Sequence, residues 1–282
     1  MSIKVCSNPV FVIGSPRSGT SILAWSLAQH TQLWTSSELY LLDYLFGDRK
    51  IDAALRRNDT EKQWCWLREQ NVSAGEFLKY LGLGIDALMT SRSQGKRWVD
   101  QTPVHTLMAD TLAEMFPDAF FLHILRDGRR VVNSLVNWNQ PNLTGDDATW
   151  KLDFKSACGL WKTYVEAALD FCIRYPNRSL TVINEKLATN PSGEFNEIFK
   201  RLALPYEEPP INYLQSNVVN SSFQSPTHVP HKVEPWKEWT VGQKDIFLRE
   251  TGSAVEQYRI VQDDWYSLRK APIYRAGNDV QR

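Results

Sequence analysis

Residues 10–30, VFVIGSPRSGTSILAWSLAQH, place a short apolar run, a polar loop and an apolar-periodic helix in direct succession. The apolar run ends at Gly14, and helical spacing of apolar residues begins after Gly19. A strand that passes through such a turn into a helix presents unpaired backbone N–H groups, and the helix dipole adds partial positive charge. The stretch therefore predicts an anion-binding loop, although an ordinary strand-to-helix turn has a similar composition.

The nature of the anion depends on a few residues of this loop. Arg17 places a guanidinium at the loop tip, where it can form a forked contact with a tetrahedral anion. The loop nearly matches the triphosphate-binding signature GxxxxGK[ST], with Gly14, Gly19 and Ser21 in place. Thr20, however, replaces the lysine that reaches the β- and γ-phosphates. The sequence therefore disfavours an ATPase, and a kinase with a variant loop stays open as an alternative.

The composition is that of an ordinary globular protein. The 282 residues are 43% hydrophobic and 23% charged, and the formal net charge is zero, so any anion site is local and nucleic acid is not an expected partner. The four cysteines form no CxxC pair and no metal-like cluster with histidine, which with the lack of a signal peptide predicts a cytoplasmic protein with reduced thiols. The apolar runs are strand-sized, so we expect no membrane span.

Short apolar runs alternate with helical patterns along the whole chain, which is typical of an α/β fold with a central parallel β-sheet flanked by helices. The runs that predict buried strands are 9–14, 97–100, 119–125 and 179–184. Helices are predicted after Gly19, over 104–116, after Gly128, and over 155–174, 193–203 and 241–259. We expect one domain over 1–282, with a helical cap at about 38–93 and a long functional loop at about 205–239.

A second candidate anion site follows the third predicted strand. Residues 120–138, FFLHILRDGRRVVNSLVNW, put Arg126 at the carboxyl end of that strand, where open α/β sheets bind ligands. Ser134 lies about two helical turns further on, so both groups can converge on one anion. Taken singly, Arg126 is equally well explained as a surface arginine paired with Asp127, and Ser134 as a helix-surface hydroxyl.

Together the two stretches resemble the motifs of sulfotransferases that use 3′-phosphoadenylyl sulfate. Residues 14–23, GSPRSGTSIL, match the family form G-x-x-R-S-G-T-[ST]-x-L, and RDGRRVVNS resembles R-D-P-x-x-x-x-x-S with Gly128 in place of the usual proline. We expect that replacement to be tolerated because both residues suit turns. The pattern is most similar to tyrosylprotein-type and bacterial sulfotransferases, and the resemblance implies a three-layer P-loop-like fold.

The resemblance also implies the roles of individual residues. The donor's 5′-phosphosulfate end would bind to the loop, and its 3′-phosphate would be held by Arg126 and Ser134. The product would be adenosine 3′,5′-bisphosphate. The loop residues implied are Arg17, Ser18, Gly19, Thr20 and Ser21.

The base that removes the acceptor's proton has two candidates. Glu38, in LWTSSELYLL at 33–42, follows a short β-like segment, and its spacing from Arg17 resembles that of the catalytic glutamate of tyrosylprotein sulfotransferases. The same pattern also fits a helix start with Glu38 in its first turn. His105, in DQTPVHTL at 100–107, is the competing base.

One position departs from the family pattern. Relatives tend to read D-K-[ST]-P where this chain has Gln101, so the lysine that helps stabilise the leaving group is missing. Either Arg17 carries that task alone or a lysine from elsewhere replaces it, and Lys232 in the predicted long loop is the candidate donor contact. His123, in the middle of a strand, and Trp161, in a helical stretch, are expected in the core.

The predicted reaction is an in-line transfer of a sulfuryl group to a hydroxyl, or less favourably to an amine. The transferred group carries less charge than a phosphoryl group, so no metal is expected. A carbohydrate, lipid, phenol, other small molecule or peptide tyrosine fits as acceptor, and the sequence does not predict the oligomeric state. A nucleotide-binding module that has lost catalysis, with Gln101 as the symptom, is the alternative of a different class.

Overall fold

The computed structural model describes residues 4–6, 8–47, 66–138, 152–217 and 235–263. The strands are β1 (Val10–Ile13), β2 (Leu33–Thr35), β3 (Arg97–Asp100), β4 (Phe120–Leu125) and β5 (Ser179–Ile183). The helices of the first half are α1 (Thr20–Leu27), α2 (Tyr40–Phe46), α4 (Trp66–Glu69), α5 (Ala74–Arg92), the 3₁₀ helix η1 (Pro103–Met108), α6 (Ala109–Met115) and α7 (Gly128–Val136). Those of the second half are α8 (Phe154–Arg174), α9 (Asn184–Thr189), α10 (Pro191–Leu202), α11 (Pro209–Ser216), α12 (Pro235–Glu238) and α13 (Val241–Asp263).

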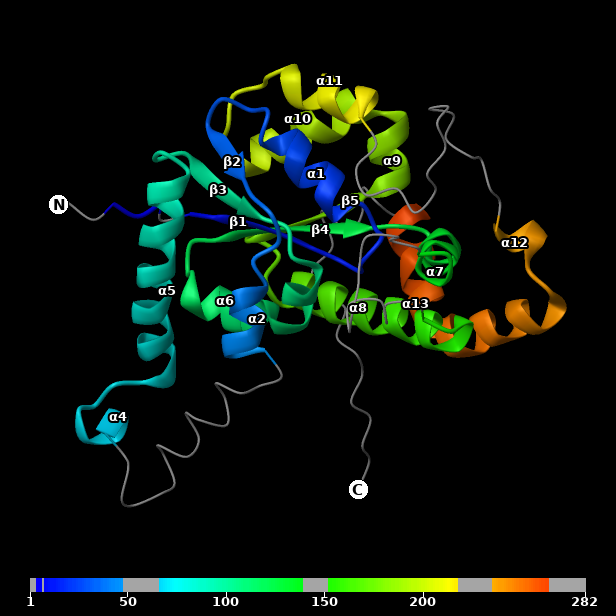
Figure 1. Ribbon diagram of the computed structural model, residues 1–282, viewed down its shortest axis with the longest axis horizontal. Helices are drawn as coiled ribbons and strands as arrows, with labels where there is room; N and C mark the ends of the chain where they lie inside the picture. Colours follow the sequence, from blue (N-terminus) through cyan, green and yellow to red (C-terminus); the bar gives the residue numbers. More distant parts are fainter. Residues whose placement is uncertain (1–3, 7, 48–65, 139–151, 218–234, 264–282) are drawn as a thin grey trace.

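The five strands form one parallel sheet in the order β2-β3-β1-β4-β5 (Figure 1). Strand β1 is central, with Val10 opposite Val99 of β3 and Ile13 opposite His123 of β4. Both β1 and β4 are buried along their whole length, as expected for strands covered on two faces. The predicted central parallel sheet flanked by helices is therefore confirmed, and β2 is the short β-like segment that precedes Glu38.

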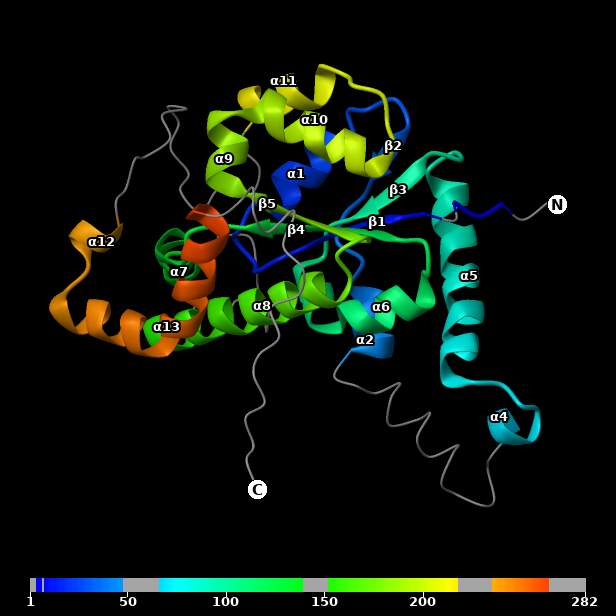
Figure 2. The ribbon, with the colours of Figure 1, turned by 180° about the vertical axis from the view of Figure 1, so that it is seen from behind.

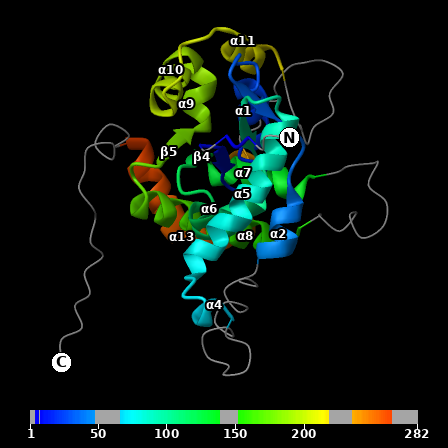
Figure 3. The same cartoon turned by 90° about the vertical axis from the view of Figure 1, so that its left-hand side faces the viewer.

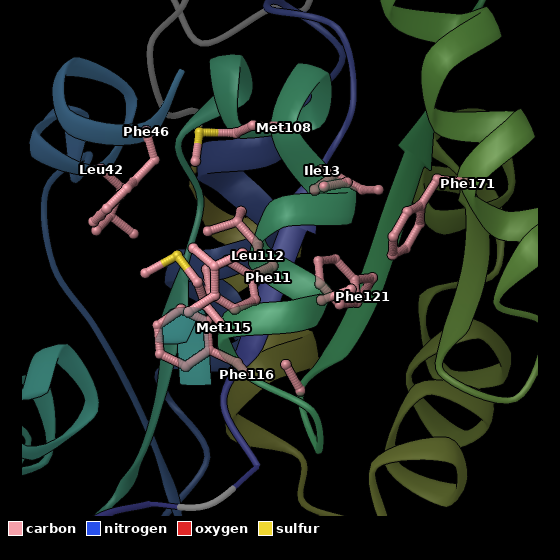
Figure 4. Close-up of a cluster of buried hydrophobic side chains, with 14 of the residues drawn as sticks. Phe11, Ile13, Leu42, Phe46, Met108, Leu112, Met115, Phe116, Phe121 and Phe171 are labelled. Carbon is pink, nitrogen blue, oxygen red and sulfur yellow. The ribbon is translucent and has the colours of Figure 1, made fainter. Parts of the chain in front are cut away.

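Helices cover both faces of the sheet and make three layers (Figures 2 and 3). One face packs against α2, α5, α6 and α8, and the other against α1, α9, α10 and α11. In the first of these layers Phe11 stacks on Phe121 with ring centroids 5.3 Å apart, and Phe116 lies on the other side of Phe11 (Figure 4). Burial of each such aromatic side chain stabilises the fold by roughly 1.5–3 kcal/mol.

A third apolar cluster ties the helices near the carboxyl ends of β4 and β5 to the sheet. It joins α7, α8 and α13, and Trp161 of α8 lies at its centre with no exposed surface. Because α7 carries Ser134, this cluster positions one of the predicted anion-binding groups. None of the described helices combines the length and the apolar character that crossing a bilayer requires.

Two predicted segments differ from the structure. The stretch 205–239, predicted as a loop, contains α11 and α12 within its described part, so that prediction is wrong there. The prolines at 209 and 210 occupy the first turn of α11, where proline is tolerated because that turn lacks N–H partners anyway. The cap predicted at 38–93 is helical where described, yet α5 stands by the amino ends of the strands, away from α7 (Figure 1).

Candidate functional site

The candidate site lies at the carboxyl ends of β1, β4 and β5 (Figure 1). The loop after β1 leads into α1, Arg126 follows β4, and Asn184 follows β5 as the first residue of α9. Adjacent parallel strands end at the same edge of a sheet, so their following residues meet there. This topology explains why segments more than 100 residues apart form one cluster.

The loop after β1 requires its glycines for two separate reasons. Gly14 has φ 149° and Gly19 has φ 102°, a backbone region that favours glycine. In addition, a Cβ at Gly14 would lie 2.5 Å from the Ile124 carbonyl oxygen, and one at Gly19 would lie 2.6 Å from Asn184 Nδ2. The loop therefore approaches its neighbours more closely than any other residue type allows.

Side chains of the residues that follow β4 and β5 hold the outer carbonyl groups of the loop. Asn184 Nδ2 donates to the Ser18 carbonyl at 3.1 Å, and Arg126 Nη1 donates to the Arg17 carbonyl at 2.8 Å. In a trans peptide the N–H and C=O groups point in opposite directions, so fixing these carbonyls also fixes the N–H groups of Ser18 and Gly19. Thr20 and Ser21, the first residues of α1, are buried directly after the loop.

The two predicted anion motifs touch each other. Arg17 Nε donates to Ser134 Oγ at 3.1 Å, and Ser134 is only 8% exposed. The guanidinium of Arg17 also lies 3.7 Å from the ring centroid of Trp138, which follows the end of α7. The structure therefore brings Arg17, Arg126 and Ser134 together, as the sequence predicts, and adds Trp138 to them.

This cluster concentrates positive charge in a protein whose net charge is zero. Burial and the neighbouring Arg126 guanidinium lower the pKa of Arg17 to about 10, and the opposite charge of Glu38 acts in the other direction. Arg17 therefore stays a cation at neutral pH, and a second cation lies beside it. An anion bound between the two guanidiniums would offset their mutual repulsion. This arrangement therefore favours the binding of an anion.

Glu38 lies half-buried between β2 and α2, within electrostatic range of Arg17. Burial and a hydrogen bond with Glu38 raise the pKa of the Tyr40 phenol. The next peptide group is also held, because Leu39 N–H donates to Thr102 Oγ1 at 2.6 Å. The Glu38 carboxylate thus lies near the cationic cluster, and it accepts a hydrogen bond from the phenolic hydroxyl of Tyr40.

His105, the competing base, has a different environment. Its side chain is 0% exposed, and its Nδ1 lies 2.7 Å from Asp100 Oδ2. Burial alone raises the pKa of Asp100, but the charge of His105 and hydrogen bonds from His105 and Thr102 hold it below its usual value. An imidazole enclosed in this way has no access to an acceptor hydroxyl, which argues against His105 as the base.

The remaining predicted residues divide between buried and undescribed positions. Gln101 is 4% exposed, and its Oε1 has no hydrogen-bond partner among the described residues. Lys232 lies outside the described residues. Burial lowers the pKa of His123 to about 3, so this core histidine is neutral, as expected for a group inside a strand. Within the described ranges, no three or more His, Cys, Asp or Glu side chains gather as metal ligands would.

Sequence reasoning missed four residues that shape this site. Thr102 and Thr106 lie in the segment examined for its base, and only their contacts across the fold reveal a role. Asn184 follows a predicted strand at the same edge of the sheet as Arg126, so its position after that strand could have identified it as a site residue. Trp138 comes four residues after Ser134, just beyond the end of α7, and this spacing is a weaker signal.

Comparison with known proteins agrees with the family that the two anion motifs resemble. A family model described as "Sulfotransferase family" matches residues 9–208. The chain is 25% identical over 225 residues to Protein-tyrosine sulfotransferase A of Caenorhabditis elegans, covering 76% of this chain and 57% of that protein. It is 22% identical over 202 residues to Protein-tyrosine sulfotransferase of Drosophila melanogaster, covering 71% of this chain and 38% of that one. The chain thus spans about half the length of these curated relatives.

Solved structures share the fold. The sulfotransferase domain from the Synechococcus PCC 7002 olefin synthase superposes with a TM-score of 0.56 at 22% identity, covering 89% of this chain and 95% of that one. Mouse sulfotransferase SULT7A1, solved in complex with PAP, gives a TM-score of 0.52 at 13% identity, covering 93% of this chain and 89% of that one. The family model matches most of the chain, and the fold agrees with it. This protein belongs to the sulfotransferase family.

Proposed function

We propose that the protein transfers a sulfuryl group from 3′-phosphoadenylyl sulfate to a hydroxyl acceptor. The observation that carries this proposal is the contact between the two motifs, in which Arg17 Nε donates to Ser134 Oγ beside Arg126. A donor with phosphate groups at both ends of a ribose needs two anion sites at a fixed separation. A loop before α1 and a clamp on α7 meet that need at one edge of the sheet.

The donor would bind through the chain's own cradle. The loop residues Arg17, Ser18, Gly19, Thr20 and Ser21 would contact the 5′-phosphosulfate end. The close approach of Gly14 and Gly19 to their neighbours leaves the inner side of this loop as backbone, which suits a phosphate. Arg126 and Ser134 would hold the 3′-phosphate, and Lys232 is a proposed further contact.

In the transfer step, the acceptor oxygen forms a bond to sulfur while the bond from sulfur to the donor's phosphate oxygen breaks. The acceptor's proton passes to the Glu38 carboxylate, and the negative charge that develops on the leaving phosphate oxygen faces the Arg17 guanidinium. Gln101 stands where relatives have a lysine and brings no charge, so Arg17 carries this stabilisation. The two guanidiniums supply the positive charge, and we propose that the reaction needs no metal.

Glu38 is the favoured base because it faces the cationic cluster, whereas the imidazole of His105 is enclosed. The hydrogen bond between Tyr40 and Glu38 supports a phenolic hydroxyl as the first acceptor class to test. The similarity to the protein-tyrosine sulfotransferases of Caenorhabditis elegans and Drosophila melanogaster supports the same choice. We therefore propose a tyrosine side chain as the first acceptor to test, with carbohydrate and other small hydroxyl compounds as further candidates.

A reducing compartment such as the cytoplasm remains our proposal for location. The described cysteines, Cys6, Cys158 and Cys172, are free thiols. Burial raises the pKa of Cys172 to about 11 and that of Cys158 to about 12, so these two thiols stay protonated and unreactive at neutral pH.

The test is transfer from 3′-phosphoadenylyl sulfate to a single-tyrosine peptide, followed by mass spectrometry of the peptide. Glu38→Gln is expected to lower the turnover by at least about 100-fold, since a positioned general base contributes that much. Binding of adenosine 3′,5′-bisphosphate is expected to stay unchanged, because Glu38 does not contact the donor phosphates in this account. Glu114→Gln, the same change at an exposed position of α6, is the matched control.

Two outcomes would count against the proposal. Near-normal turnover of Glu38→Gln would remove Glu38 as the base. Bisphosphate binding without transfer to the peptide or to a panel of phenols and sugars would favour a nucleotide-binding module that has lost catalysis. The buried and uncharged Gln101 supports that alternative.

A further inference from the structure

One short segment bonds both to the donor loop and to the residue that follows the proposed base. It runs from Asp100, the last residue of β3, to Thr106 in η1. Its two threonines are buried, Thr102 with 0% and Thr106 with 2% of their surface exposed. Each threonine hydroxyl bonds both within the segment and to a distant part of the chain, and the Thr106 hydroxyl lies within hydrogen-bond distance of both the N–H and the carbonyl oxygen of Gly14.

Thr102 connects the segment to the base. Its hydroxyl donates to Asp100 Oδ1 at 2.8 Å and accepts from Leu39 N–H at 2.6 Å. That N–H belongs to the peptide group that joins Glu38 to Leu39. Because the peptide is planar, this bond fixes the backbone from which the Glu38 side chain projects.

Thr106 makes the equivalent connection to the donor loop. Its hydroxyl lies 2.7 Å from the Pro103 carbonyl oxygen, to which it donates, and it accepts from Gly14 N–H at 2.8 Å. Gly14 is the residue at which β1 turns into the loop. The bond therefore fixes the start of the loop that would receive the phosphosulfate.

A buried contact between Asp100 and His105 holds the two ends of the segment together. Asp100 Oδ2 lies 2.7 Å from His105 Nδ1 and accepts from Thr102 N–H at 3.2 Å, while Oδ1 receives the Thr102 hydroxyl. This carboxylate thus joins the beginning and the end of the segment.

We propose that Thr102 and Thr106 are positioning residues that place the base and the donor loop relative to each other. This inference rests on the proposed function, and it assigns His105 to the support of this segment. Thr102 acts on the acceptor side through Leu39, and Thr106 acts on the donor side through Gly14. In-line transfer depends on the alignment of acceptor oxygen, sulfur and leaving oxygen, so two anchors on one rigid segment give the reaction its geometry.

The experiment compares Thr102→Val with Thr106→Val, since valine keeps the shape of threonine and removes the hydroxyl. For each variant, calorimetry measures the affinity for adenosine 3′,5′-bisphosphate, and transfer from 3′-phosphoadenylyl sulfate to the single-tyrosine peptide gives kcat. Thr102→Val is expected to lower kcat by about tenfold or more with unchanged bisphosphate affinity. Thr106→Val is expected to weaken bisphosphate binding by about threefold to tenfold, the loss typical of one hydrogen bond.

Three controls separate positioning from loss of folding. Thr102→Ser and Thr106→Ser keep the hydroxyl and are expected to restore the affected quantity, which a merely structural defect would not do. Thr163→Val is the matched surface control, because among the residues that the structure describes the hydroxyl of exposed Thr163 bonds only to the Gly159 carbonyl in its own helix. Circular dichroism checks that each variant is folded.

The outcomes distinguish this inference from the function on which it rests. A wild-type chain that binds no bisphosphate overturns the proposed function and this inference with it. An active wild type whose two valine variants lose neither quantity, or lose both quantities in parallel, overturns the positioning roles alone. The predicted split, with kcat lost in one variant and affinity in the other, supports them.

Discussion

Arg17 is held in a backbone conformation that few side chains adopt. Its φ is 70°, in the left-handed region, which costs a non-glycine residue about 1–3 kcal/mol. Such a conformation persists only where the surroundings enforce it. Here Arg126 binds the Arg17 carbonyl, Ser134 accepts from its Nε, and Trp138 stacks on its guanidinium. The strain is thus located at the tip of the anion loop, where the side chain has to point into the site.

The buried Asp100 carboxylate makes stability depend on pH in a predictable direction. Its pKa is lower in the folded chain than the ordinary value of about 3.9, so its contribution to stability is present above that value and disappears as the pH falls through the folded pKa. Asp100→Asn is expected to lower the free energy of unfolding at pH 7 by about 3 kcal/mol, because His105 loses its buried partner.

Urea denaturation at pH 7 and at pH 3 measures this contribution. The difference in stability between the wild type and Asp100→Asn should narrow at the lower pH, because below about 3.9 the unfolded chain already binds a proton at Asp100 that the folded chain binds only at lower pH. Asp118→Asn, at an exposed position, is the control and should show a small difference at both values. A difference for Asp100→Asn that is equally large at pH 3 would contradict the prediction.

At this scale the sequence predicted the groups that follow strands and missed those that act across the fold. Arg17 and Arg126 could be placed because each follows an apolar run, and such runs end at one edge of a parallel sheet. The roles of Thr102 and Thr106 depend on contacts with residues 63 and 92 positions away, which no local pattern encodes. The sequence does not distinguish an accessible histidine from an enclosed one. Only the structure therefore shows that the imidazole of His105 is buried.

At the level of elements, Gly128 shows why one motif position differs from the family pattern. We expected glycine to be tolerated here because it suits a turn as proline does, but space gives a stronger reason. A Cβ at position 128 would lie 2.7 Å from atoms of the Trp161 indole, which is fully buried under the start of α7. The packing of α7 against α8 therefore requires a residue without a side chain.

Gly128→Ala is accordingly expected to destabilise the protein by about 1–3 kcal/mol, the usual range for an overpacked core. The same change at Gly159, in the middle of α8, meets nothing within 4 Å and is expected to be neutral or to stabilise by up to about 1 kcal/mol. Denaturation in urea gives both values. Equal stability of Gly128→Ala and the wild type would show that α7 can shift without cost.

The elements predicted best are those with strong and simple patterns. β1 and β4 are continuous apolar runs that are buried on both faces, and both were predicted. β2 has only three residues, so the sequence indicates it only as a short β-like segment before Glu38, and it pairs with β3. α11 was missed because its prolines suggested a loop, although proline fits the first turn of a helix.

For the molecule as a whole, the zero net charge conceals a local arrangement. Positive charge collects at the edge of the sheet where β1 and β4 end, and Glu38 lies next to it. The sequence could predict the fold class and this edge, since both follow from the order of apolar runs and the residues after them. It could not predict the acceptor, because the surface that receives an acceptor is made by side chains from separate elements.

The proposed function requires that this edge of the sheet prefers a nucleotide with a 3′-phosphate over a triphosphate. Calorimetric titration of the intact chain with adenosine 3′,5′-bisphosphate and, separately, with ATP and Mg²⁺ tests it most directly. The bisphosphate is expected to bind at least about tenfold more tightly, since charge-assisted hydrogen bonds from Arg126 and Ser134 contribute about 1.5–3 kcal/mol. Ser134→Ala should reduce that preference. ATP binding as tight as, or tighter than, that of the bisphosphate would contradict the account.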